Sequence, residues 1–518
     1  MYIGIDCGTQ GTKAIVVDRR KKQVIGVGYA AHEMIENTQG RREQEPEWWT
    51  QALVNACQQA IKQAQIEPHL IKGIGVSGQQ HGLVVLDEHD QPLYPAKLWC
   101  DTETAVENEQ FIEALGGQQA AFEQLGIMVQ TGYTASKLAW LRKHFPQKYQ
   151  SIAKIMLPHD YLNYWLTGQF CMEYGDASGT GFFDIHNRTW HQQAFSKLAP
   201  ELDIQKVLPP LLRAEQKIGR IKAEVAQLLG LSGQVVVSTG GGDNMMGAIG
   251  TGNIKQGIAT MSLGTSGTLY AYTDKPLANL PMEIANFCSS SGGWLPLVCV
   301  MNMTSANRNL MELLDINVEE FNQLIEQSPI GAEGIRILPF FNGERVPPLP
   351  QAKASILGLD SANFTQANLA RAMMEAASFT LRYGLDLFRQ AGLSTQQIRL
   401  IGGGAKSTIW RQMIADIMNA EVVCLKEEEA GALGAAIQAM WANGEADLAS
   451  LCEQFVKLDE QSKVQPNPQS AVQYEGVYQT YLVSTRVPCK QYQLSTREDT
   501  TPVRNPRASP IICVNTCF

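Results

Sequence analysis

The N-terminal part of the chain alternates short apolar runs with polar segments rich in glycine. Residues 2–6 and 13–18 are dominated by aliphatic and β-branched side chains, and the segment CGTQGT at 7–12 supplies turn residues between them. This pattern is typical of two strands joined by a tight hairpin. The same criteria predict further elements in this region: strands at 24–29 and 71–76, and a helix that begins near Pro46 and ends at about 64.

The second half of the chain contains longer helical patterns. Apolar residues recur at helical spacing after Thr365, which predicts a long amphipathic helix. A strand at 398–401 is then followed by the glycine loop 402–405 and a helix at about 408–418, and residues 429–436 open a close-packed helix rich in glycine and alanine. Helical patterns also dominate 103–168. Strands that alternate with helices in this way predict the α/β class.

A short motif occurs twice in the chain. Gly-Thr-x-Gly-Thr is found at 8–12 and again at 264–268, about half the chain apart, and β-rich runs flank both copies. Chance repetition of so short a motif is the alternative. We interpret the repeat as two related α/β domains that face each other across a cleft. The predicted domains are residues 1–247 and 248–482.

The last part of the sequence differs in character. From about Val483 four prolines (Pro488, Pro502, Pro506 and Pro510) interrupt the chain, basic residues outnumber acidic ones, and hydrophobic periodicity is lost. We therefore expect residues 483–518 to form a poorly ordered or loosely docked tail.

Composition and charge exclude several classes of partner. The 518 residues carry a net charge of −9 without a long basic run, which argues against nucleic acid as the main partner. Neither a signal peptide nor a long apolar segment is recognisable, so we expect a cytoplasmic protein that does not interact with membranes. The 11 cysteines form no C-x-x-C pair, and the histidines show no metal spacing. Any metal should therefore be a hard cation held by carboxylates.

The glycine-rich segments are suited to binding phosphate. Glycine lets the backbone approach a ligand closely and direct several N–H groups at it, and threonine and serine hydroxyls add further donors. The strand, glycine loop and helix around 402–408 have the geometry that presents amides to a nucleotide. Neither hairpin matches a Walker A loop or a dinucleotide fingerprint, which disfavours P-loop kinases and dehydrogenases. The candidate phosphate-binding residues are Gly8, Thr9, Gly11, Thr12, Lys13, Gly264, Thr265 and Ser266.

Two carboxylates stand beside these loops. Asp6 precedes the first hairpin, where a carboxylate can hold Mg²⁺ through water, although it would alternatively cap a neighbouring amide. Asp243 follows three glycines, which leave room for a ligand, so it suits a general base that takes a hydroxyl proton during phosphoryl transfer. An Asx-turn in the glycine loop is the structural alternative for Asp243.

Polar and aromatic residues near 80 and 99 are candidates for binding a sugar. Gln80 and His81 lie in a loop after a predicted strand, although a lone histidine is often structural. The sequence does not decide whether Trp99 stacks on a sugar or packs in the core. The roles of Lys137 and Trp140 are left open in the same way.

Two longer segments carry a resemblance to a known family. Residues 132–141, GYTASKLAWL, fit its first signature, and residues 354–359, ASILGL, with 368–375, NLARAMME, fit its second. With these segments the chain resembles the FGGY carbohydrate kinases, which belong to the superfamily of sugar kinases, heat-shock chaperones and actin. The resemblance extends from residue 1 to about 481.

The resemblance implies two ribonuclease H-like, actin-like ATPase domains around a central cleft, and ATP with Mg²⁺ as the cofactors. It places the catalytic base on Asp243 and the Mg²⁺-associated acid on Asp6, and we expect both carboxylates near the metal. The substrate expected from the resemblance is D-xylulose, and because relatives often form dimers a homodimer is expected too. The residues implied for adenosine are Gly403, Gly404, Ala405 and Thr408, and those for the sugar are Gln80, His81, Trp99, Asp243 and Asn244.

Position 80 departs from this pattern, because it is Gln where the resemblance leads us to expect Met. Alternatives to a xylulose-specific enzyme are another kinase of the family, acting on ribulose, gluconate, fuculose or glycerol, and an actin- or chaperone-like ATP switch. The GGGDN segment at 240–244 and the Gln80-His81 pair argue against the switch. A third alternative is a carbohydrate-binding module without catalytic activity. It is disfavoured because the two phosphate-binding hairpins would then have no role.

Overall fold

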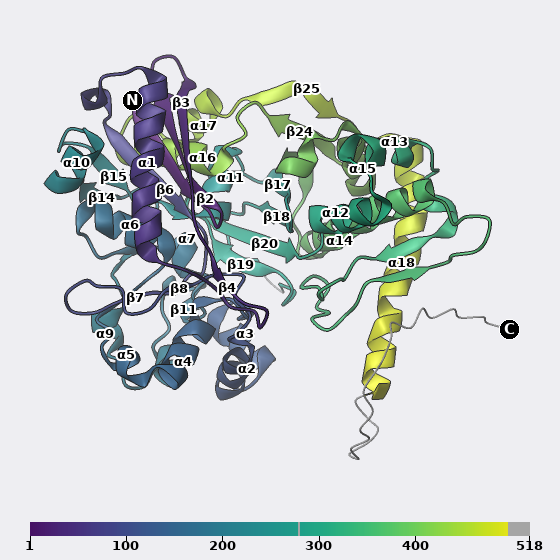
Figure 1. The fold of residues 1–518 in the computed structure, drawn as a ribbon, viewed down its shortest axis with the longest axis horizontal. Coiled ribbons are helices and arrows are strands. Elements are labelled where there is room, and N and C mark those ends of the chain that lie inside the picture. The colour runs from purple at the N-terminus through teal and green to yellow at the C-terminus, as the bar shows by residue number, and fades with distance from the viewer. Residues whose placement is uncertain (278–279, 496–518) are drawn as a thin grey trace.

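The protein folds into two lobes, each built around one seven-stranded sheet (Figure 1). The structure is a computed structural model that describes residues 1–277 and 280–495. The sheet of the first lobe has the order β14-β15-β6-β1-β2-β3, and the short β16 also pairs with β6. Its strands are β1 (Tyr2–Cys7), β2 (Gly11–Asp18), β3 (Gln23–Ala31), β6 (Gly73–Gly78), β14 (Lys217–Arg220), β15 (Val236–Ser238) and β16 (Gly241–Gly242).

The sheet of the second lobe has the order β19-β20-β18-β17-β23-β24-β25. Its strands are β17 (Gly257–Leu263), β18 (Gly267–Ala271), β19 (Ala285–Cys288), β20 (Trp294–Val300), β23 (Thr395–Ile401), β24 (Glu421–Leu425) and β25 (Leu458–Val464). In both sheets an antiparallel hairpin carries the repeated motif, and its first strand pairs in parallel with a later strand: β1 with β6, and β17 with β23. The predicted α/β class and both predicted hairpins are confirmed.

Helices cover the sheets and extend the first lobe. The predicted helix at 46–64 is α1 (Pro46–Ala64), which packs on β2 and β3. The other helices of the first lobe include α2 (Ala105–Ala114), α3 (Gln118–Leu125), α4 (Thr134–His144), α5 (Pro146–Gln150), α6 (Pro158–Thr167), α7 (Tyr174–Ala177), α8 (Gln192–Leu198), α9 (Ile204–Val207), α10 (Ala223–Leu229) and α11 (Asp243–Gly250). The second lobe includes α12 (Thr304–Leu314), α13 (Val318–Glu326), α14 (Gln366–Gln390), α15 (Thr408–Met418) and α18 (Pro468–Ser495).

Two helices from late in the sequence return to the first lobe. Helices α16 (Ala430–Ala442) and α17 (Leu448–Phe455) follow strands of the second sheet, yet α16 packs on β1 and β6 and against α11. Figure 1 shows both of them beside the N-terminal strands. Residues that the sequence pattern assigns to the domain 248–482 are thus part of the core of the first lobe.

Glycines allow the backbone of α16 to contact the backbones of its neighbours directly. A Cβ atom on Gly434 would lie 1.8 Å from the carbonyl oxygen of Met246 in α11, and one on Gly250 would lie 1.8 Å from that of Ala430. On the sheet side, a Cβ atom on Gly4 would lie 1.8 Å from the carbonyl oxygen of Ala432. These contacts fix α11 against α16 and α16 against the sheet, with no space for a side chain at the crossing points.

The C-terminal helix corrects one expectation. Instead of losing helical structure at 483, the chain continues as α18 to Ser495. The buried rings of Tyr474, Tyr478 and Tyr481 anchor this helix on the second lobe. Extending an anchored helix requires only the favourable propagation step, because nucleation is already complete. Residues 496–518, the rest of the predicted tail, lie outside the described residues.

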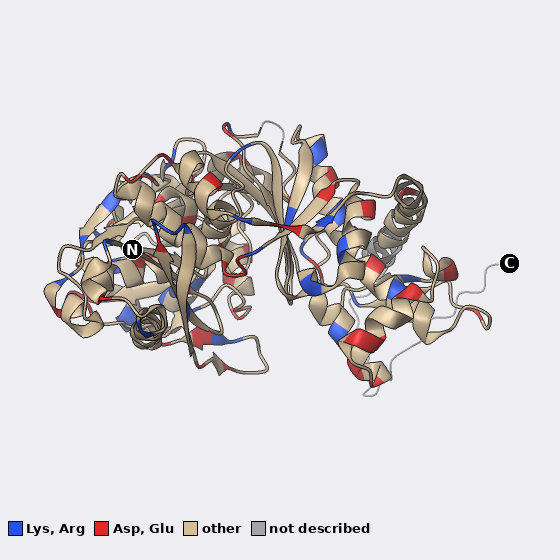
Figure 2. Ribbon diagram, turned by 90° about the horizontal axis from the view of Figure 1, so that it is seen from above, with Lys and Arg blue, Asp and Glu red and all other residues tan. Residues whose placement is uncertain are grey.

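Charged residues of both signs are interspersed over the two lobes (Figure 2). No helix in the described part of the chain is long and apolar enough to cross a membrane.

The glycine contacts predict the effect of adding one methyl group. Gly434→Ala should lower the free energy of unfolding by about 1–3 kcal/mol, because the new Cβ atom would overlap the backbone of α11. Urea-induced unfolding measures this. Gly476→Ala in α18 is the matched control, since a Cβ atom there would meet nothing within 4 Å. Equal effects of the two substitutions would contradict the role assigned to the α11–α16 contact.

Candidate active site

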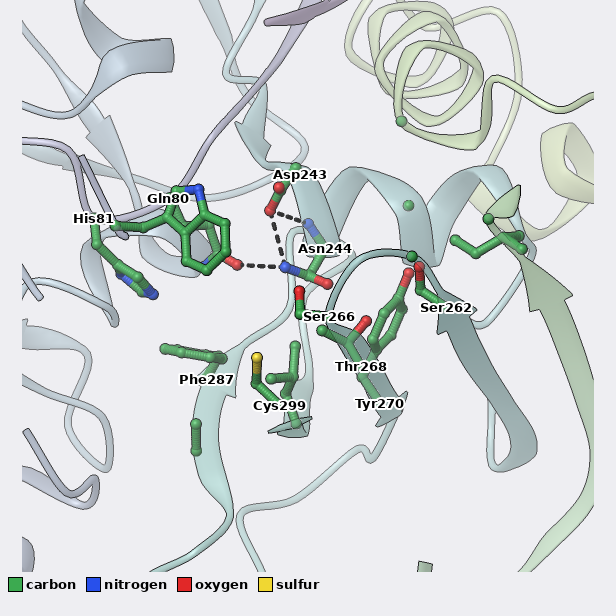
Figure 3. A pocket seen from close by; sticks show the side chains of 18 of the residues that line it. Gln80, His81, Asp243, Asn244, Ser262, Ser266, Thr268, Tyr270, Phe287 and Cys299 are labelled. Carbon is green, nitrogen blue, oxygen red and sulfur yellow. Dashed lines mark hydrogen bonds between the residues drawn. The ribbon is translucent and has the colours of Figure 1, made fainter. Parts of the chain in front are cut away.

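A cavity of about 450 Å³ lies between the lobes, at the carboxyl ends of the central parallel strands. The registers of β1, β6 and β16 place Asp6, Ser77 and Gly241 side by side, so the segments that follow these strands meet at one edge of the sheet. This arrangement gathers Asp6, Gln80, His81 and Asp243 around the cavity (Figure 3).

Asp243 is the first residue of α11 and faces the cavity. Its Oδ1 accepts hydrogen bonds from the backbone N–H of Asn244 at 2.7 Å and from the Asn244 side chain at 2.9 Å. Burial, and then the negative charge of Asp6, raise the pKa of Asp243 to about 7. The carboxyl group therefore changes its protonation state near neutral pH.

Asp6 lies one residue before the end of β1, on the same side of the cavity. Its Oδ1 accepts a hydrogen bond of 2.7 Å from the Ser77 hydroxyl, and burial raises the pKa of its carboxyl group. A Cβ atom on Gly431, at the start of α16, would lie 2.8 Å from Asp6 Oδ2. Lys13 also lines the cavity, with its ammonium 2.7 Å from Glu429.

The first hairpin is held by side chains of its own lobe. The Thr9 hydroxyl donates to Gln79 at 3.1 Å and accepts from the Trp99 indole N–H at 3.0 Å, and the Thr12 hydroxyl lies 2.9 Å from His32. The Gly8 N–H donates to the carbonyl of Gly11. Of the predicted residues in this hairpin, Lys13 lines the cavity, whereas the side chains of Thr9 and Thr12 are turned to partners within the lobe and Gly8 and Gly11 are not part of the lining.

The second hairpin lies on the cavity wall. Gly264, Thr265 and Ser266 all line the cavity. The loop is anchored from the start of α12, where the Thr304 hydroxyl donates to the Gly264 carbonyl at 2.7 Å and the Ser305 hydroxyl donates to the Thr265 carbonyl at 2.8 Å. These bonds occupy the carbonyl groups of the turn.

The segment predicted to bind adenosine, residues 403–408, directly follows the last residue of strand β23 and its loop that lines the cavity. Strand β23 and the loop after it contribute Ile401 and Gly402 to the lining. Gly403, Gly404 and Ala405 form a short 3-10 helix just beyond, and α15 then starts at Thr408. A Cβ atom on Gly403 would meet nothing within 4 Å, so the backbone is open at this residue, whereas one on Gly404 would lie 2.7 Å from the Trp410 ring.

The predicted sugar-binding residues lie together on the first lobe, and Trp99 lines the cavity with them. Gln80 Oε1 accepts a 2.9 Å hydrogen bond from Asn244, while Gln80 Nε2 is buried without a partner among the described residues. The His81 ring stacks on Tyr133, with centroids 4.3 Å apart. Burial, followed by the charges of Lys137 and Arg345, lowers the pKa of His81 well below its usual value. His81 is therefore neutral at physiological pH.

Lys137, whose role the sequence left open, is fully buried beneath this loop. Its ammonium donates to the carbonyl oxygens of His81 at 2.5 Å and Gly132 at 2.6 Å. His81 has a φ of 66°, in the left-handed region. Lys137 thus holds a strained backbone segment in place at the cavity wall.

A buried charged cluster supports the segment before Asp243 from behind. His159 donates from Nδ1 to Asp176 at 2.5 Å, and Asp160 lies 3.1 Å from Nε2. Burial lowers the pKa of His159, but the two aspartates outweigh this effect and raise it to about 9. The Gly240 N–H donates to Gln438 of α16 at 2.7 Å. The loop that carries Asp243 is therefore fixed on two sides.

Several cavity residues were not singled out from the sequence. They are Tyr133, Tyr270, Phe287, Cys299, Arg345 and Glu429. Phe287 and Cys299 lie within β-strands, where an apolar side chain facing a cavity resembles one facing the core. Arg345 carries a stronger signal, as a cation in the proline-flanked segment GERVPP, but its place became apparent only from the fold.

The chain matches known proteins over most of its length. Residues 1–250 match the N-terminal domain, and residues 259–443 the C-terminal domain, of the FGGY family of carbohydrate kinases. The chain is 70% identical to a xylulose kinase of Haemophilus influenzae, over 93% of this chain and 99% of that protein. It is 33% identical to a xylulose kinase of Staphylococcus epidermidis, over 93% of this chain and 95% of that protein.

A solved structure agrees with these matches. The xylulose kinase from Bifidobacterium adolescentis is 29% identical and superposes with a TM-score of 0.79, covering 92% of this chain and 98% of that chain. The two lobes are accordingly ribonuclease H-like domains of the actin-like ATPase fold, as expected. The chain belongs to the FGGY family of carbohydrate kinases.

Proposed function

We propose that the protein transfers the γ-phosphoryl group of ATP to D-xylulose and forms D-xylulose 5-phosphate. The observation that carries this proposal is the high identity to the xylulose kinase of Haemophilus influenzae across nearly the whole of both chains. The cavity supports it independently, because it brings a carboxylate of raised pKa between a glycine-rich hairpin and a set of polar side chains suited to a sugar.

Asp243 acts as the general base. Its position at the start of α11 puts the carboxylate between the sugar-side residues Gln80 and Asn244 and the hairpin residues Gly264 to Ser266. A base with a pKa near the working pH is ionised in part of the population and still strong enough to accept a hydroxyl proton. Asn244 holds the carboxylate by two hydrogen bonds, so that its other oxygen remains for the sugar hydroxyl.

The nucleotide occupies the second-lobe side of the cavity. Backbone amides of the hairpins at 8–12 and 264–267 bind the phosphates, with the hydroxyls of Thr265 and Ser266 and the charge of Lys13 as further donors. In the first hairpin the bonds of Thr9 to Gln79 and Trp99 leave the backbone as the phosphate-binding group. The segment at 403–408 borders the adenosine.

Asp6 and Asp243 fit a divalent cation. Both carboxylates face one cavity, and each has a raised pKa: burial and the charge of Glu429 outweigh the Ser77 hydrogen bond and Lys13 at Asp6, and burial and the charge of Asp6 raise the pKa of Asp243. Oxygen ligands of this kind suit Mg²⁺. When bound, the ion would neutralise charge on the transferring phosphoryl group. Asp6 is positioned for this role by its bond to Ser77.

The sugar binds against the first lobe. Gln80 Nε2 and the side chains of His81, Asn244 and Trp99 surround the space next to Asp243, and the aromatic wall of Tyr133 and Phe287 gives an apolar face for the carbon chain. Because the lobes, proposed as domains 1–247 and 248–482, contribute opposite walls, their approach would exclude water from the transferring phosphoryl group.

Replacing the base tests this mechanism. Asp243→Asn should lower kcat about a thousandfold, because the amide is nearly isosteric but cannot accept the proton, while thermal stability and ATP binding are retained. Asp315→Asn is a matched control, since Asp315 is an exposed helix C-cap in the left-handed region, which asparagine tolerates. Steady-state kinetics and nucleotide titration give both quantities. Turnover near that of the wild type would refute the assignment of Asp243.

A substrate panel tests the choice of sugar. D-xylulose should give the highest kcat/KM among D-xylulose, D-ribulose, gluconate, L-fuculose and glycerol, measured by ADP release under identical conditions. A higher value for any other compound would overturn the substrate assignment while leaving the kinase family intact. ATP turnover that no sugar changes would instead favour an ATP-driven switch.

A further inference from the structure

Hydrogen bonds fix the backbone that carries Arg345 to the second lobe. Arg345 lies between β21 (Arg336–Leu338) and β22 (Ser355–Leu357), next to Glu344. Glu344 accepts hydrogen bonds from the Met301 N–H at 2.7 Å and from the Asn302 side chain at 3.0 Å. The Asn302 side chain also donates to the Gly343 carbonyl at 2.8 Å. The backbone that carries Arg345 is therefore tied to the end of β20.

The guanidinium of Arg345 reaches across the cavity toward the first lobe. Arg345 lines the cavity, and a Cβ atom on Gly132 would lie 3.8 Å from one of its terminal nitrogens. Its positive charge also acts on the Cys299 thiol, which lines the same cavity. Among the described residues no carboxylate lies within ion-pair distance of this guanidinium. An arginine that faces a cavity without an acidic partner has donors left for a ligand.

The position of Arg345 relative to Asp243 defines which part of a ligand it meets. Its neighbour Gly132 precedes Tyr133, whose ring stacks on His81 with centroids 4.3 Å apart, and Figure 3 shows His81 and Phe287 on the other side of Asn244 from Ser262. Asp243 and Asn244 stand between these two ends. A sugar whose terminal hydroxyl faces Asp243 would extend its other end toward Arg345.

We propose that Arg345 determines specificity for a ketose, by donating hydrogen bonds from its guanidinium to the C1 hydroxyl and C2 carbonyl oxygens at the end remote from the transferred phosphoryl group. This inference rests on the proposed function and names a contact beyond it. In an α-hydroxyketone the two oxygens can lie in one plane, which matches the planar donor fork of arginine. In a polyol the corresponding oxygens are staggered and fit the fork less well.

The same contact joins the two lobes. Gln80 and His81 belong to the first lobe and Arg345 to the second, so a ketose held by all three bridges the cavity. Sugar binding would then favour the closed arrangement, in which water is excluded from the reaction.

Calorimetric titration of the intact protein with D-xylulose and with xylitol, in which a hydroxyl replaces the C2 carbonyl, tests the proposal. In Arg345→Gln the Kd for D-xylulose should rise about tenfold or more, while the Kd for xylitol changes by less than about threefold. Arg345→Lys keeps the charge without the planar fork and should show an intermediate loss of preference. It also serves as the informative variant if Arg345→Gln does not fold.

Lys353→Gln is the matched control, because Lys353 is an exposed cation of the same segment and is not part of the cavity lining. Its two Kd values should equal those of the wild type. An unchanged ratio of the two Kd values in both Arg345 variants, or an equal rise of both Kd values, would overturn the proposal. Failure of the proposed function is distinguishable from failure of the Arg345 proposal, because in the former case the wild type would not phosphorylate D-xylulose.

Discussion

The close contact between α11 and α16 is the constraint on which the active site depends. Gly250 and Gly434 let the two helices meet at backbone distance, and Gly4 lets α16 meet β1 in the same way. Asp243 begins α11 and Asp6 lies near the end of β1, so the position of each carboxylate is set by this packing. Because the contacts involve backbone atoms, which cannot change rotamer, the relative placement of Asp6 and Asp243 is fixed before any ligand binds.

This rigidity keeps two carboxylates in an unfavourable environment. Burial raises the pKa of both Asp6 and Asp243, and a neighbouring carboxylate adds to it in each case: Glu429 beside Asp6, and Asp6 beside Asp243. Lys13, the nearby cation, lies at 2.7 Å from Glu429. In an isolated protein such an arrangement costs stability. In the proposed mechanism it is useful, since a metal ion and a substrate hydroxyl would supply the missing partners only when both substrates are present. Strain of a similar kind is present at His81, whose left-handed backbone Lys137 restrains.

Local features of the fold were predictable from the sequence, and features that depend on distant segments were not. The hairpin at 8–12, the helix at 46–64 and the strand ahead of Gly402 follow from turn chemistry and periodicity, and all three are present. The placement of α16 on the first sheet was not predictable, because an alanine- and glycine-rich helix packs equally well on either lobe until the topology is known. The sequence pattern therefore did not indicate that this helix, although it follows strands of the second sheet, packs on the first.

The candidate site shows the same limit. Asp6, Gln80, His81 and Asp243 were identified because each follows a predicted strand, and the parallel register of those strands brings them together. Thr12 was selected for its hydroxyl, which instead lies against His32. Arg345 was missed because its local signal, a cation in a proline-flanked loop, does not indicate that the fold places it at the cavity. A crystal structure with D-xylulose and a non-hydrolysable ATP analogue would show whether Asp243 stands between the sugar and the phosphate. We expect the sugar O5 within about 2.6–3.2 Å of an Asp243 carboxylate oxygen and in line with the γ-phosphorus. A sugar bound with every hydroxyl beyond reach of Asp243 would refute this role of Asp243.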